Sequence, residues 1–137
     1  MEINYCEAAS RHWDDAELLE GNKRFPNSDQ LYGLAAECAL KAVMVALGAP
    51  TTTEGDLSEI SHRQHIDALW PVFQSFASGR RGSRYLSPLR KFDANPFEDW
   101  NVVHRYAADS TAPSGSARTN HSKAARSCFV VLQRATE

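Results

Sequence analysis

Residues 27–48, NSDQLYGLAAECALKAVMVALG, constrain the fold of this chain more than any other stretch. At about 3.6 residues per turn, their apolar side chains fall into two adjacent stripes, and only a narrow strip remains for other residues. The stripes contain Leu31, Leu34, Ala35, Cys38, Ala42 and Val45, and Tyr32, Ala36, Ala39, Leu40, Val43 and Leu47. A helix that is apolar almost all round belongs inside a bundle rather than on its surface.

Glu37 and Lys41 are the charged exceptions within this stretch. They stand four residues apart with Glu first, which is the favoured order for an ion pair along a helix. One interpretation is a salt bridge at a solvated or interface position. The other is a buried pair that holds a third group, and Arg105 is the candidate for a structural ion pair of Glu37, Lys41 and Arg105.

Other segments show helical patterns of apolar residues, and none shows the alternation of a strand or an internal repeat. We expect further helices at residues 4–20, 61–77 and 96–108, and a last helix that begins at Thr119 or Asn120. Asn27 or Ser28 is expected to cap the helix of 27–48, and Pro71 to kink or restart the helix of 61–77. The predicted fold is all-α, an antiparallel bundle of four to five helices in a single domain of residues 1–137.

Composition places the chain among ordinary globular proteins, since 42% of its 137 residues are hydrophobic and 23% are charged. No apolar run is long enough for a bilayer and no export signal is present, so we expect no membrane association. The widely spaced Cys6, Cys38 and Cys128 argue against a disulfide framework and favour the cytoplasm. His62 and His65 lack further ligands at helical spacing, so we expect no metal site, and without a phosphate loop we expect no cofactor.

Residues 78–91, SGRRGSRYLSPLRK, form the most basic stretch of the chain. The simpler interpretation is a solvated loop. The alternative is a patch that binds phosphate oxygens or an acidic partner, for which Arg80, Arg81 and Arg84 are the leading candidates.

Four motifs, taken in order, resemble the HEPN family of small helical-bundle proteins. They are HWDDA with two following leucines at residues 12–19, YGLAAECALKA at 32–42, HIDALW at 65–70 and DWNVVHRY at 99–106. The resemblance implies a bundle of four or five helices, usually dimeric. Family members are typically prokaryotic toxins or defence RNases, often encoded beside a nucleotidyltransferase-type antitoxin, and others are non-catalytic modules associated with nucleotides or RNA. On this basis we expect a homodimer with such an antitoxin, another protein, RNA or a nucleotide as partner.

The sequence departs from the catalytic pattern of the family. Active HEPN ribonucleases resemble one another in an Arg placed about four to six residues before a His, where His does acid–base work and Arg stabilises a charged phosphate. None of the histidines here, which are His12, His62, His65, His104 and His121, has an Arg at that spacing. In one alignment Asp99 takes the place of the Arg. We prefer the other, in which Arg105-Tyr106 resembles the Arg-Tyr pair of a branch that often lacks the catalytic pattern.

Two main functions remain. The first is a non-catalytic dimeric module that binds RNA, a nucleotide or a cognate protein, with the helix of 27–48 or the last helix as the dimer face. The alternative is a metal-independent RNase toxin that uses His104 and Arg105, with Tyr106 beside them, across a dimer cleft. Two copies are needed in that case, because adjacent helical side chains point about 100° apart. A bundle with a purely structural role is the third option.

Overall fold

The computed structural model is all-helical and describes residues 1–79 and 81–137, with Arg81 and Gly82 described by their backbone alone. In these residues the α-helices are α1 (Tyr5–Gly21), α2 (Phe25–Ala46), α3 (Ile66–Ser78) and α4 (Gly115–Ala135). Short 3-10 helices are η1 (Ile60–His62), η2 (Arg81–Tyr85), η3 (Ser87–Leu89), η4 (Val102–Tyr106) and η5 (Asp109–Thr111). The all-α prediction is confirmed for the described residues, where the sole β-pairing is an isolated bridge between Thr51 and Leu57.

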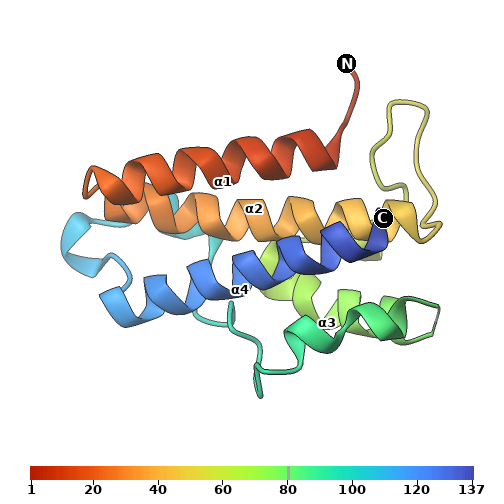
Figure 1. The fold of residues 1–137 in the computed structure, drawn as a ribbon. Helices are drawn as coiled ribbons and strands as arrows, with labels where there is room; N and C mark the ends of the chain where they lie inside the picture. The colour runs from red at the N-terminus through yellow and green to blue at the C-terminus, as the bar shows by residue number, and fades with distance from the viewer. Residues whose placement is uncertain (80) are drawn as a thin grey trace.

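The helix α2 is the centre of the bundle, and α1, α3 and α4 all pack on it (Figure 1). Its burial on nearly all sides follows from its two apolar stripes, and Leu40, Val43 and Met44 are fully shielded from solvent. Because one chain already covers α2, its apolar surface does not require a second copy. Which helix supplies a dimer face stays a prediction. None of the helices in the described part of the chain has the length and apolarity needed to span a bilayer.

The start of α2 differs from the expected one. The helix begins at Phe25, with Arg24 as a cap residue that makes no side-chain cap hydrogen bond and Pro26 in the first turn. Ser28 is buried, and its hydroxyl donates to Glu20 of α1 at 3.0 Å instead of capping the helix. Proline at the first turn gives up an amide that has no partner there, which explains why the helix extends to it.

Pro71 lies inside α3 without breaking it. A proline cannot donate to the carbonyl four residues earlier, which here belongs to Asp67. The side chain of Asn95 takes over that carbonyl, because its Nδ2 donates to the Asp67 oxygen at 2.7 Å. The helix therefore continues through Pro71 rather than restarting there. It begins later than predicted, because His65 precedes it in an extended conformation.

Residues 96–108 do not form the predicted α-helix. The side chain of Asn95 accepts from the Phe97 amide at 2.9 Å, and that of Asn101 accepts from Val103 at 2.8 Å, so that turns and η4 replace it. The tertiary contacts favour this path, because Phe97 and Trp100 are both buried. The indole of Trp100 covers Gly33 of α2, and its Nε1 donates to the Asp29 carbonyl at 3.1 Å.

The last helix starts earlier than predicted. Ser114 caps α4, and its hydroxyl oxygen accepts from the Ala117 amide at 3.1 Å. Residues 115–118, which precede the predicted helix start at Thr119 or Asn120, thus form the first turn of α4. This extension brings Arg118 and His121 onto the same rigid element.

Candidate functional site

The proposed catalytic residues His104, Arg105 and Tyr106 lie together on η4. Arg105 is exposed and its guanidinium carbon lies 4.8 Å from the centroid of the Tyr106 ring. His104 is half-buried, and its Nδ1 is shielded from solvent without a hydrogen-bond partner. Neighbours in a 3-10 helix point about 120° apart. A single chain therefore does not aim His104 and Arg105 at one phosphate.

The buried ion pair of Glu37 and Lys41 is present, with 3.0 Å between Glu37 Oε2 and Lys41 Nζ. The third member is His65, whose Nδ1 lies 3.1 Å from Glu37 Oε1. Arg105 does not take that place, because its guanidinium stacks on Tyr106 instead. Sequence reasoning did not find His65, because its contact with Glu37 joins segments 28 residues apart and depends on how they pack.

The two histidines with metal-like spacing have other partners. His62 Nε2 lies 3.4 Å from Glu59 Oε2, and the His62 ring meets the edge of Phe76. His65 contacts Glu37. Across the described residues, no three His, Cys, Asp or Glu side chains gather in a way that could hold a metal ion.

The basic stretch of residues 78–91 is described in part. Arg80 and the side chain of Arg81 lie outside the described residues, so their predicted phosphate contacts stay predictions. Arg84 is exposed; its Nη2 donates to the Tyr85 hydroxyl at 2.6 Å, and its guanidinium carbon lies 4.7 Å from the Tyr85 ring centroid. Guanidinium groups stack on aromatic faces and also recognise phosphate, so Arg84 remains a candidate for phosphate binding.

Arg134 of α4 extends this basic stretch from a distant part of the sequence. Its Nη1 donates to Ser87 Oγ at 3.1 Å. Arg84, Tyr85, Arg134 and Glu137 line a common hollow of about 470 Å³. We call Arg84, Arg90, Lys91 and Arg134 the basic surface. In the described chain none of these four cations lies within ion-pair distance of a carboxylate. Glu137 shares the hollow with Arg84 and Arg134, and the charges of these three side chains leave it a net charge of +1.

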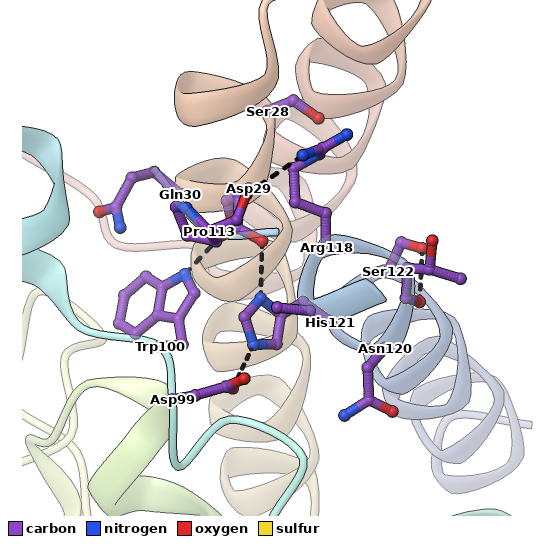
Figure 2. Close-up of polar contacts among 12 residues, drawn as sticks. Ser28, Asp29, Gln30, Asp99, Trp100, Pro113, Arg118, Asn120, His121 and Ser122 are labelled. Carbon is purple, nitrogen blue, oxygen red and sulfur yellow. Dashed lines mark hydrogen bonds and ion pairs between the residues drawn. The ribbon is translucent and has the colours of Figure 1, made fainter. Parts of the chain in front are cut away.

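A buried charge network that the sequence did not predict lies at the other end of α4. His121 bridges two carboxylates: Nδ1 is 2.6 Å from Asp29 Oδ1 of α2, and Nε2 is 2.6 Å from Asp99 Oδ1 (Figure 2). His121 and Asp29 are completely buried, whereas 55% of the Asp99 side chain is exposed. Both contacts are attractive when the ring is protonated and donates on each side, so we assign His121 as an imidazolium.

Electrostatics support that assignment. Burial by itself lowers the pKa of His121, but the hydrogen bonds and charges of Asp29 and Asp99 outweigh it, and the net shift of the pKa is upward. The ring also stacks on Phe97 with 5.4 Å between centroids. His121 has no solvent access, and the network ties α2, α4 and the segment of Asp99 together.

A sequence signal for this network exists in retrospect. His121 stands on the apolar stripe of the last helix, four residues before Ala125 and seven before Cys128. Asp29 stands three residues before Tyr32 on a stripe of α2. A histidine and an aspartate at core positions of two packed helices are expected to pair, because a lone buried charge is costly.

Comparison with known proteins identifies no relative. No protein-family model, curated protein or solved structure matches this chain. The resemblance to HEPN proteins therefore rests on the sequence motifs alone.

Proposed function

We propose that this protein is a HEPN-like helical module of a prokaryotic toxin–antitoxin or defence system, and that it binds RNA through its basic surface. The observation that carries the proposal is the meeting of Arg84 and Arg134 in one hollow beside Tyr85. These arginines come from segments that are distant in the sequence, and neither lies within ion-pair distance of a carboxylate in the described residues. Glu137 lines the same hollow, and the two arginines outweigh its single charge.

The chemistry of such a surface suits single-stranded nucleic acid. Arginine guanidinium groups bind phosphate oxygens with paired N–H donors, and each contact releases counterions from the strand. Tyr85 is half-buried and held by Arg84, which leaves a rigid aromatic edge next to the cations. Arg90 and Lys91, which follow Arg84 by six and seven residues in the sequence, are both exposed.

The proposal retains the homodimer and the antitoxin partner that the family resemblance implies. Since α2 is largely covered within one chain, we propose that a dimer uses other apolar surface as well. Leu18, Val103 and Tyr106 are the large apolar side chains of α1 and η4 that remain exposed, at 64%, 61% and 73%. Light scattering of the purified chain measures the oligomeric state directly.

RNA binding is tested by fluorescence anisotropy with a labelled single-stranded RNA at low ionic strength. We expect the Arg84→Gln/Arg134→Gln double variant to bind at least about tenfold more weakly, since two charge-assisted contacts are lost. The matched control is Arg11→Gln/Arg126→Gln, which removes the same charge from exposed positions on α1 and α4. Equal losses in the two double variants contradict a defined site, and no binding by the wild type contradicts the function.

The catalytic alternative is tested with the same RNA in EDTA. We expect the wild type, His104→Ala and Arg105→Ala to leave the RNA intact, because His104 and Arg105 point apart on η4. Cleavage by the wild type that is lost in folded His104→Ala and Arg105→Ala variants reverses this conclusion in favour of a metal-independent RNase.

A further inference from the structure

A second cationic site lies at the end of the bundle opposite the basic surface. The turn between α1 and α2 meets the segment that leads from η5 into α4, and together they enclose a pocket of about 710 Å³. Lys23 and Arg24 come from the turn, and Arg118 comes from the first turns of α4. Arg118 and Arg134 lie near opposite ends of α4, so this pocket and the basic surface are separate sites.

Arg118 is held in place before any ligand arrives. Its guanidinium carbon lies 4.0 Å from the ring centroid of Phe25, and its Nη1 donates to the Pro113 carbonyl at 3.2 Å (Figure 2). Its Nε is buried and has no hydrogen-bond partner. A guanidinium that these contacts already hold in place loses little conformational entropy on binding an anion.

The charges of the pocket match a phosphate monoester. Lys23, Arg24, Arg118 and Asp109 line it, and three cations with one carboxylate leave a net charge of +2. In the described part of the chain, no carboxylate lies within ion-pair distance of any of the three cations. A phosphate monoester near pH 7 carries a charge of about −1.5 to −2, so it neutralises the pocket without a metal ion.

The turn itself favours a role for the Lys23 side chain. Lys23 has a φ of 60°, which is a left-handed conformation that normally selects glycine or asparagine. A lysine there costs conformational energy that glycine avoids. The next residue, Arg24, is the N-cap of α2 and makes no side-chain cap hydrogen bond. The uncapped first-turn amides of α2 add positive potential next to Lys23 and Arg24.

The remaining walls are apolar, and they determine what accompanies the phosphate. Phe25 and Pro113 line the pocket beside Arg118, and the volume far exceeds that of a bare phosphate ion. We propose that this pocket binds a phosphate-terminated organic molecule, with the phosphate on Lys23, Arg24 and Arg118 and an apolar ring or chain against Phe25 and Pro113. Asp109 is then free to accept from a hydroxyl or amine of the ligand.

Calorimetric titration of the full chain with phenyl phosphate, inorganic phosphate and phenol tests this inference. We expect phenyl phosphate to bind at least about tenfold more tightly than inorganic phosphate, because its ring leaves water for the apolar walls. Phenol alone should give no measurable binding. Equal affinities for the two phosphates, or no binding of phenyl phosphate, overturn the proposal and leave RNA binding at the basic surface untouched.

Two variants locate the site. Arg118→Gln should bind phenyl phosphate at least about tenfold more weakly, whereas Arg126→Gln, an exposed arginine further along α4, should bind it as the wild type does. Lys23→Gly should also weaken binding while raising the denaturant midpoint, which separates a lost contact from a damaged fold. Wild-type affinity in both Arg118→Gln and Lys23→Gly contradicts the assignment.

The phosphate can belong to a free metabolite-sized molecule or to the 5′ end of a strand. The Arg84→Gln/Arg134→Gln variant, titrated with 5′-phosphorylated RNA and with the same RNA bearing a 5′-hydroxyl, separates the two sources. The pocket is assigned to strand ends if this variant binds the 5′-phosphorylated RNA more tightly and if adding Arg118→Gln to it removes that preference. Equal binding of the two RNAs, together with tight binding of phenyl phosphate, assigns it to small molecules.

Discussion

His121 Nδ1 lies 2.6 Å from Asp29 Oδ1, and both side chains are completely shielded from solvent. The contact joins α4 to α2, and Asp99 on the other side of the ring joins the segment of Trp100 to both helices. A buried carboxylate without a cation is costly, so each member of the network depends on the others. Arg118 stands one turn before His121 on α4, and the network therefore also fixes one wall of the phosphate pocket.

Replacement of His121 should destabilise the fold strongly. We expect His121→Gln to lower the free energy of unfolding by about 3–5 kcal/mol, because Asp29 is left as a buried charge without its cation. Urea unfolding followed by tryptophan fluorescence measures this change. The control is His104→Gln, at a half-buried histidine that makes no ion pair in the described residues. A loss below about 1 kcal/mol for His121→Gln contradicts the network.

Stability should fall as pH rises from about 6.5 to 8. The pKa of His121 is raised in the folded state, so the ring contributes stability that is fully present below its unfolded pKa of about 6.5 and is lost as pH passes the folded pKa. Burial raises the pKa of Cys38 to about 12, and thiol ionisation in the unfolded chain adds a separate decline above about pH 8. Between about pH 6.5 and pH 8, the free energy of unfolding should decline with pH in the wild type but not in His121→Gln.

Gly33→Ala should destabilise the protein by about 2–3 kcal/mol, since overpacking forces buried neighbours to move. A Cβ atom at Gly33 would lie 2.2 Å from Cε2 of Trp100, and Trp100 is held by its hydrogen bond to Asp29. Gly21→Ala is the matched control, because nothing lies within 4 Å of a Cβ at that position. The midpoint of thermal unfolding should be lower for Gly33→Ala than for Gly21→Ala. Similar midpoints contradict the close packing of Trp100 on α2.

The sequence predicted the parts of the fold that depend on local periodicity. The burial of α2 follows from apolar residues at helical spacing, and the Glu37–Lys41 pair follows from residues four apart on that helix. Both depend on neighbours along a single helix. The end of α1, at Gly21, was predicted within one residue for the same reason.

Long-range contacts account for what the sequence did not predict. Residues 96–108 carry a helix start signal, yet the burial of Trp100 against Gly33 draws the chain into turns. Arg105 was expected at Glu37, but His65 reaches that carboxylate from a segment next to α3. Such partners are set by how the helices pack, which periodicity within one segment does not determine.

The salt dependence of RNA binding tests most directly whether Arg84 and Arg134 contact RNA phosphates. For single-stranded RNA, each phosphate contact contributes about 0.7 to the slope of log affinity against log salt concentration. Arg84→Gln/Arg134→Gln should therefore reduce this slope by about 1.4, while Arg11→Gln/Arg126→Gln should leave it nearly unchanged. This result places RNA phosphates on Arg84 and Arg134. An unchanged slope in the Arg84→Gln/Arg134→Gln variant contradicts the proposed function of the basic surface.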